Sequence, residues 1–88
     1  MSLTRERMRA DIAALIHEAP EEIGGDDNLI DLGLDSMRAM NLLVAWSKTG
    51  LELDFSEFAE RLTLDAWWAI VRRCQEDAAR RGGVQGGA

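Results

Sequence analysis

The sequence predicts an all-α fold, a four-helix bundle with a short third helix and a long first loop. One proline, no tyrosine and few runs of β-branched residues favour helices over strands. Apolar residues recur mainly at helical spacing, and the periodic segments are bounded by residues that start or end helices. With 88 residues, of which 47% are hydrophobic and 30% charged, the chain can form one globular domain with a modest core.

The first helix is expected over residues 4–19. Its apolar residues recur every three or four positions and form one stripe: Met8, Ile12, Leu15, Ile16 and Ala19. Pro20 should end this helix, because proline lacks the backbone N–H that the next turn needs. His17 falls on the polar face with no second potential ligand at metal spacing, so we assign it no role.

Residues 20–35 are expected to form the long first loop. The segment 24–28 is rich in glycine, aspartate and asparagine, which is typical of turns. Four apolar residues should pin the loop across the helix ends: Leu29, Ile30, Leu32 and Leu34. The neighbouring aspartates suggest a calcium site, but the central glycine and terminal glutamate of an EF-hand loop are missing. The sequence therefore favours a solvated acidic loop.

The second helix is expected over residues 36–48, with Asp35 as its N-cap and Gly50 as its terminator. Its apolar residues cover more of the helix than one core contact requires: Met37, Met40, Leu42, Leu43, Val44 and Trp46. Two interpretations stay open. The helix packs on several sides, or adaptable side chains such as Met37 and Met40 face partners.

Residues 51–55 are expected to be extended, and residues 56–61 leave room for one short helix capped by Asp54 or Ser56. Phe55 and Phe58 should anchor this helix, unless one of them faces a partner. Thr63 is the expected N-cap of the last helix, whose apolar stripe contains Leu64, Trp67, Val71, Cys74 and Ala78, flanked by Trp68. Because two adjacent tryptophans cannot face the same way, one of them should be only partly buried. The helix should fade at Arg80 and Arg81, so residues 1–81 form the domain and residues 82–88 a flexible glycine-rich tail.

Composition excludes several classes of site. The single cysteine excludes an internal disulfide and a cysteine-based zinc site, and Cys74 is expected to be an inert thiol of the core. The N-terminal residues are charged and lack the apolar segment of a signal peptide. No apolar run approaches the length that spans a membrane. We therefore expect a cytoplasmic protein with no membrane partner and no metal.

The net charge of −6 is concentrated in the middle of the chain, where residues 21–65 hold eleven acidic and three basic residues. A nucleic-acid partner is not expected, because phosphate binding needs a basic surface. Basic protein surfaces are the expected partners, since opposite charge speeds encounter. An acidic domain that needs no partner remains an alternative on charge alone.

Ser36 should lie at the first position of the second helix, at the positive end of the helix dipole. A catalytic role is not supported, because a serine nucleophile needs a base within reach and the one histidine, His17, lies on another helix. The glycine pattern of a nucleophile elbow is also absent. Ser36 could instead be modified, since a phosphate ester at a helix N-terminus is favoured. By residue type alone, shared capping with Asp35 is the better explanation of this serine, because serines at helix starts are common.

The segment Leu32-Gly33-Leu34-Asp35-Ser36-Met37 resembles the phosphopantetheine attachment motif of acyl and peptidyl carrier proteins. Residues 27–31 resemble the loop before that motif. The segment Thr63-Leu64-Asp65-Ala66-Trp67-Trp68 resembles the start of the last helix in aryl carrier domains, which serve siderophore-type nonribosomal peptide synthesis. The resemblance runs from about Asp26 to Val71. No isochorismatase domain precedes this segment, so the resemblance implies a free-standing carrier.

The resemblance implies a non-catalytic carrier that acts as a monomer. A phosphopantetheinyl transferase would attach the 4′-phosphopantetheine of coenzyme A to Ser36. An adenylating enzyme would then load an aryl or aminoacyl group as a thioester, for a condensation or tailoring enzyme of nonribosomal peptide or related secondary metabolism. Asp35 would cap the helix and help the transferase recognise the site, and Met37, Met40 and Phe55 would contact partners. The alternative is an acidic helical interaction module without a prosthetic group.

Overall fold

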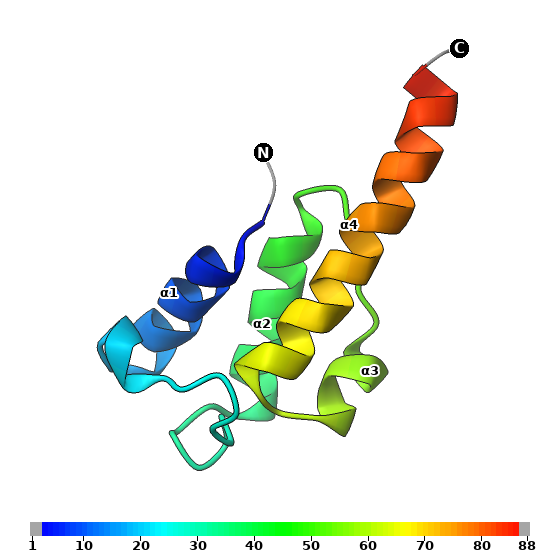
Figure 1. Cartoon of the computed structure of the whole chain (residues 1–88). Coiled ribbons are helices and arrows are strands. Elements are labelled where there is room, and N and C mark those ends of the chain that lie inside the picture. Colours follow the sequence, from blue (N-terminus) through cyan, green and yellow to red (C-terminus); the bar gives the residue numbers. More distant parts are fainter. Residues whose placement is uncertain (1–2, 87–88) are drawn as a thin grey trace.

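The computed structural model describes residues 3–86, with side chains as far as residue 80 (Figure 1). The elements are α1 (Arg5–Ile16), the 3₁₀ turn η1 (Pro20–Glu22), α2 (Ser36–Ser47), α3 (Phe55–Glu60) and α4 (Leu64–Gly86). No strand occurs within residues 3–86, so the predicted all-α bundle with a short third helix is confirmed. In this part of the chain, no helix combines the length and apolarity needed to cross a membrane.

Three side chains cap helices as the sequence predicts. Asp35 caps α2, Asp54 accepts a hydrogen bond from the Ser56 N–H at the start of α3 (3.0 Å), and Thr63 Oγ1 accepts one from the Ala66 N–H in α4 (3.2 Å). Gly50, just past the end of α2, has a φ of +97°, the left-handed conformation that glycine adopts without a Cβ clash. Short-range capping chemistry thus defines most of the helix ends.

The predicted end of the first helix is wrong. α1 ends at Ile16 rather than near residue 19, because His17 takes a left-handed conformation (φ 59°) and its N–H bonds to the Ala13 carbonyl. Pro20 then begins η1 instead of ending a helix. Ala19 is consequently exposed, while Ala13, which the predicted stripe omitted, is buried.

The predicted end of the last helix also differs from the structure. α4 continues to Gly86 and projects beyond the bundle, whereas the sequence predicted fading at Arg81 (Figure 1). Extending an existing helix adds one backbone hydrogen bond per residue without a new nucleation step. Residues 87–88 lie outside the described residues, and the flexibility of the 82–88 tail stays a prediction.

Three aromatic rings occupy the centre of the core. Trp46, Phe58 and Trp67 have ring centroids 5.3–6.5 Å apart, and all three are buried. Both indole N–H groups have partners: Trp46 donates to Asp11 Oδ2 and Trp67 to the Phe58 carbonyl, each at 2.9 Å. These bonds let two tryptophans be buried without an unsatisfied donor. Trp68 is half-buried, which confirms that one of the two adjacent tryptophans is only partly buried.

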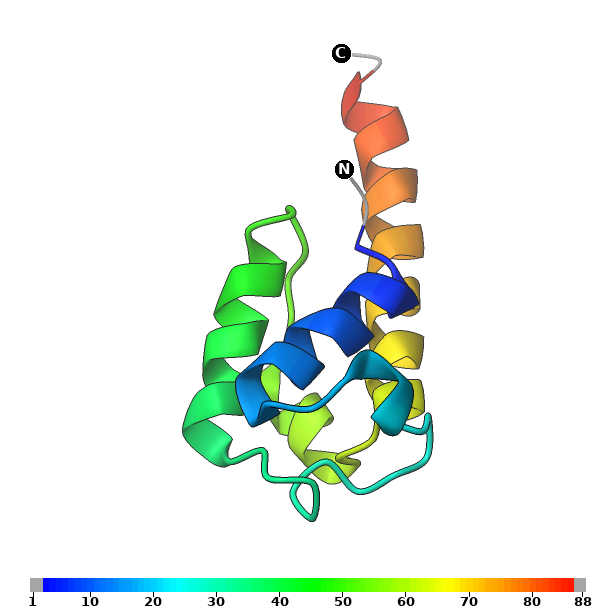
Figure 2. The same ribbon diagram turned by 90° about the vertical axis from the view of Figure 1, so that its left-hand side faces the viewer.

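The long first loop is fastened to the segment that begins α4. Leu29 is fully buried, and its N–H donates to the Leu62 carbonyl at 2.8 Å. The Gly25 carbonyl accepts a hydrogen bond from the Asp65 N–H at 2.9 Å, and a Cβ added at Gly25 would lie 2.4 Å from the Asp65 carboxylate, which would have to move. The loop therefore closes one end of the bundle beside the start of α2 (Figures 1 and 2).

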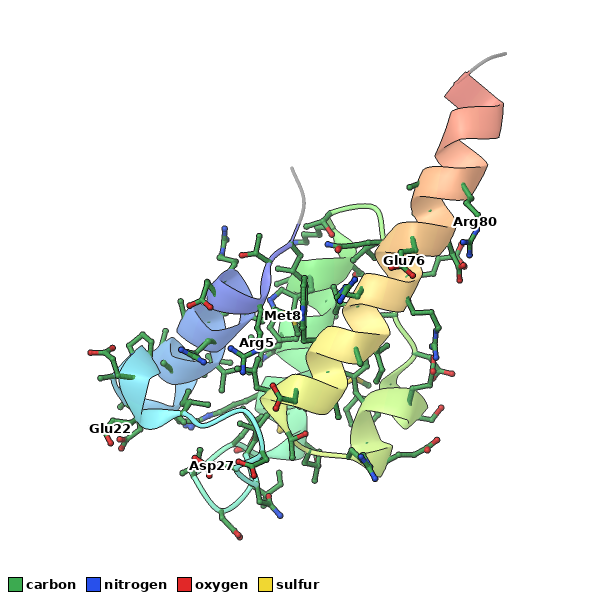
Figure 3. All side chains as sticks on the ribbon, viewed as in Figure 1. Arg5, Met8, Glu22, Asp27, Glu76 and Arg80 are labelled. Carbon is green, nitrogen blue, oxygen red and sulfur yellow. The ribbon has the colours of Figure 1, made fainter. Side chains whose placement is uncertain are left out.

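Not every apolar residue of the loop is buried as predicted. Leu34 is buried and Leu32 half-buried, but Ile30 is 41% exposed. Figure 3 shows Met8 in the interior of the bundle, whereas Glu22 projects outward. Asp27 turns back onto the loop, where its Oδ2 accepts a hydrogen bond from the Gly24 N–H at 2.9 Å. The loop thus combines buried anchors with an acidic outer face.

Candidate functional site

Ser36 lies at the junction where the long loop becomes α2. Gly33, with a φ of +115°, allows the tight turn in which the Gly33 N–H donates to the Ile30 carbonyl at 3.0 Å. Leu34 then enters the core with 2% exposure, while Asp35 and Ser36 emerge at the surface. A buried anchor is thus followed directly by an exposed aspartate and serine, which fixes where the hydroxyl lies.

Asp35 supplies the cap of α2. Its backbone is extended, and its Oδ1 accepts a hydrogen bond from the Arg38 N–H at 2.8 Å. Within the described residues, Ser36 Oγ makes no hydrogen bond to the protein. The interpretation in which Ser36 shares the capping is therefore wrong, and its hydroxyl is available for other chemistry.

The start of α2 suits a phosphate group. In the part of the chain that the structure describes, the N–H groups of Ser36 and Met37 have no hydrogen-bond acceptor, as expected in the first turn of a helix. These donors and the positive helix end favour an anion attached to the neighbouring hydroxyl. The exposed Ser36 Oγ thus fits the attachment of a phosphate ester without rearrangement of the backbone.

The described residues give Ser36 no catalytic partner. His17 is exposed at the end of α1, and within the described residues no hydrogen bond joins it to the serine. No group of three or more histidine, cysteine, aspartate or glutamate side chains between residues 3 and 80 is placed to hold a metal ion.

An exposed apolar row follows Ser36 along α2. We define the α2 row as Met37, Met40 and Val44, whose side chains are 79%, 48% and 57% exposed. Ala39, Leu42, Leu43 and Trp46 form the buried face of the same helix. The structure thus decides between the two interpretations of α2: Met37 and Met40 are surface residues. Sequence reasoning listed Val44 without placing it at the surface, although the spacing 37, 40, 44 indicates one face.

The α2 row and Ile30 are the large hydrophobic side chains that the described residues leave exposed. Ile30 lies in the loop that leads to Ser36, so these exposed side chains all lie in the two elements on either side of the serine. Phe55, the third predicted partner contact, is half-buried at the start of α3 and packs against the core.

Negative charge surrounds this site. Several arginines are neutralised by neighbours, including Arg5 by Asp65 at 2.8 Å, Arg7 by Asp11 at 3.2 Å and Arg73 by Glu57. Five acids of η1 and the loop that follows it make no ion pair within the described residues: Glu21, Glu22, Asp26, Asp27 and Asp31. The acidic excess expected from the sequence is therefore uncompensated on the loop that precedes Ser36.

The pKa values of Asp54 and Cys74, which lie outside the Ser36 site, are shifted. Hydrogen bonds from the Ser56 hydroxyl and N–H lower the pKa of Asp54 at the start of α3. Partial burial raises the pKa of the Cys74 thiol, whose Sγ lies 3.5 Å from the Glu52 carbonyl. The raised pKa agrees with the inert thiol predicted for Cys74, although this residue lies at the edge of the core rather than inside it.

Comparison with known proteins identifies the family. A family model described as "Phosphopantetheine attachment site" matches residues 6–70. The chain is 36% identical to the acyl carrier protein ScoB of Streptomyces coeruleorubidus over 82 residues, which cover 93% of this chain and 89% of that protein. No solved structure matches.

Two other relatives are longer proteins. The chain is 45% identical over 68 residues to an isochorismatase of Bacillus subtilis (strain 168), covering 77% of this chain and 22% of that protein. It is 41% identical over 70 residues to enterobactin synthase component B of Escherichia coli (strain K12), covering 80% of this chain and 24% of that protein. The chain thus spans only about a quarter or less of these two proteins.

Members of this family carry covalently attached 4′-phosphopantetheine and are substrates of other enzymes rather than catalysts. The match covers most of the described residues and includes Ser36 and α2. The chain therefore belongs to the phosphopantetheine attachment family and is a carrier protein of the acyl and aryl carrier type.

Proposed function

We propose that Ser36 is the residue to which 4′-phosphopantetheine is attached. A bond would form between Ser36 Oγ and the phosphorus that bears the pantetheine arm. The pyrophosphate bond of coenzyme A would break, the nucleotide would leave, and the serine proton would pass to a base of the transferase. The observation that carries this proposal is the Ser36 hydroxyl, which is exposed at the start of α2 and makes no hydrogen bond within the described residues.

The arm would carry an acyl group as a thioester on its terminal thiol. We assign an aryl or aminoacyl cargo, loaded by an adenylating enzyme and passed to a condensation or tailoring enzyme of nonribosomal peptide or related secondary metabolism. The similarity to enterobactin synthase component B and to the isochorismatase supports this pathway class. Because every cargo reaction takes place in a partner enzyme, the carrier needs only to present the arm.

Partner enzymes would dock on the α2 row beside Ser36. Methionine side chains adapt to differently shaped surfaces, which suits a protein that meets several enzymes in turn. Phe55 would add a third contact, and the acidic loop would attract basic partner surfaces. These interfaces should be small and transient, because each partner must release the carrier. We also propose that the carrier is a cytoplasmic monomer, in agreement with its use of coenzyme A.

Intact-mass measurement tests the attachment point. The protein is incubated with coenzyme A, Mg²⁺ and a broad-specificity phosphopantetheinyl transferase. The wild type should gain one phosphopantetheine and Ser36→Ala none. Ser56→Ala is the matched control, because Ser56 is also an exposed serine in the first turn of a helix capped by aspartate. No gain by the wild type would refute the proposal and favour an acidic interaction module without a prosthetic group.

A further inference from the structure

Arg38, two residues after Ser36, connects the start of α2 to the end of α1. Its Nη1 donates to the Leu15 carbonyl at 3.1 Å, and its backbone N–H donates to Asp35 Oδ1 at 2.8 Å. Its Nε lies 3.9 Å from Asp35 Oδ2. One residue thus contacts both the cap of α2 and the last turn of α1.

The last turn of α1 benefits from this contact. The final carbonyls of a helix lack intrahelical partners and carry partial negative charge, so a cation there is stabilising. The last turn of α1 contains no basic residue of its own. Arg38 supplies both a hydrogen-bond donor and a positive charge from the neighbouring helix.

Two hydrogen bonds join α1 and α2 within the described residues. Trp46 Nε1 donates to Asp11 Oδ2 near the C-terminal end of α2, and Arg38 donates to the Leu15 carbonyl near its N-terminal end. Of these two bonds, the one made by Arg38 therefore connects the turn containing Ser36 to α1. The first turn of a helix otherwise frays readily, because few backbone hydrogen bonds hold it.

We infer that Arg38 is a positioning residue for the modification of Ser36. By fastening the start of α2 to α1, it keeps the Asp35 cap and the first turn formed before a transferase binds. This inference rests on the proposed attachment at Ser36. If only part of the carrier population has the turn formed, the apparent affinity falls by that fraction. Loss of Arg38 should therefore raise KM for the carrier and leave kcat nearly unchanged.

The test compares three variants of the full chain. Arg38→Met keeps the apolar stem and removes the donors, whereas Arg38→Lys keeps a cation that can reach the Leu15 carbonyl. Arg72→Met is the matched control, because Arg72 is exposed and its ion pair is with Glu76 of the same helix. Steady-state phosphopantetheine transfer gives kcat and KM. Amide proton exchange by NMR on the carrier alone reports whether the N–H groups of Arg38 and Ala39 open.

Arg38→Met should raise KM by up to about tenfold, the upper limit set by losing one hydrogen bond of ordinary strength. The amides of Arg38 and Ala39 should exchange faster, and Arg38→Lys should recover part of both effects. Arg72→Met should behave as the wild type. An unchanged KM for Arg38→Met would overturn the inference. So would a raised KM with unchanged exchange, because Arg38 would then act by touching the transferase.

If Arg38→Met does not fold, Arg38→Lys carries the test with the same two readouts. A small rise in KM together with faster amide exchange at residues 38 and 39 supports the positioning role of Arg38. Wild-type values of both KM and amide exchange refute that role. Failure of the wild type to accept phosphopantetheine would instead refute the proposed function, so the two failures are distinguishable.

Discussion

Replacing Asp35 by alanine removes the side-chain acceptor at the start of α2. Its Oδ1 accepts the Arg38 N–H at 2.8 Å, and loss of such a cap typically costs about 1 kcal/mol. The ion pair with Arg38 is long, at 3.9 Å, and both side chains are well exposed. It adds only a few tenths of a kcal/mol, roughly the median value of exposed pairs.

The expected loss for Asp35→Ala is therefore about 1 kcal/mol in the free energy of unfolding. For a domain of this size, that corresponds to a decrease in Tm of about 4–8 °C. Asp35→Asn keeps a capping oxygen and should change the free energy of unfolding by less than about 0.5 kcal/mol. Asp31→Ala, in the exposed loop, is the control for removing one negative charge and should leave Tm nearly unchanged.

Circular dichroism during thermal and urea unfolding measures these differences, and the transferase assay runs beside it. Slow modification of Asp35→Asn at normal stability would indicate that the transferase recognises the carboxylate, as the family resemblance implies. Normal modification of Asp35→Asn would show that capping alone explains Asp35. A wild-type Tm for Asp35→Ala would refute the assignment of Asp35 as the stabilising cap.

Three further predictions follow from the same geometry. The double variant Met37→Ser and Met40→Ser should keep Tm within about 2–4 °C of the wild type, since both side chains are surface residues, but should raise KM for phosphopantetheine transfer. The double variant Ala69→Ser and Ala79→Ser on α4 is the control. A wild-type KM for the methionine variant would contradict the docking proposal. The lowered pKa of Asp54 implies a stabilising contribution that is present above about pH 4, the unfolded pKa, and is lost as the pH falls through the folded pKa. On acidification, the urea midpoint of Ser56→Ala should therefore fall less steeply than that of the wild type. Parallel plots of urea midpoint against pH would contradict this prediction. Because burial raises the pKa of Cys74, iodoacetamide at pH 7.5 should label this thiol slowly in the protein without phosphopantetheine. The phosphopantetheine-bearing protein should be labelled rapidly at one thiol, that of the arm. Equally fast labelling of both forms would refute the prediction that Cys74 is inert.

The features predicted from sequence are those that depend on neighbours along the chain. Asp35 and Thr63 cap the helices that follow them because a side-chain oxygen reaches an N–H three residues away. Gly50 follows the end of α2 because glycine adopts the left-handed conformation without help from residues distant in the sequence. The position of Ser36 at the start of α2 follows from the same local rule.

The features that sequence reasoning missed depend on tertiary contacts. His17 ends α1 in a left-handed conformation, although it is neither glycine nor asparagine, and no local signal before Pro20 indicates this. The exposure of Met37 and Met40 could not be decided, because periodicity shows which residues share a face but not which face meets the core. The bond from Arg38 to the Leu15 carbonyl joins residues 23 positions apart and has no sequence signature.

Attachment of phosphopantetheine to Ser36 is tested most directly by peptide mapping of the modified protein. After incubation with coenzyme A, Mg²⁺ and the transferase, proteolysis and fragmentation mass spectrometry locate the added group. We predict one phosphopantetheine per chain, carried by Ser36 in the wild type and in Ser56→Ala, and none in Ser36→Ala. Modification at another residue, or undiminished modification of Ser36→Ala, would contradict the central claim.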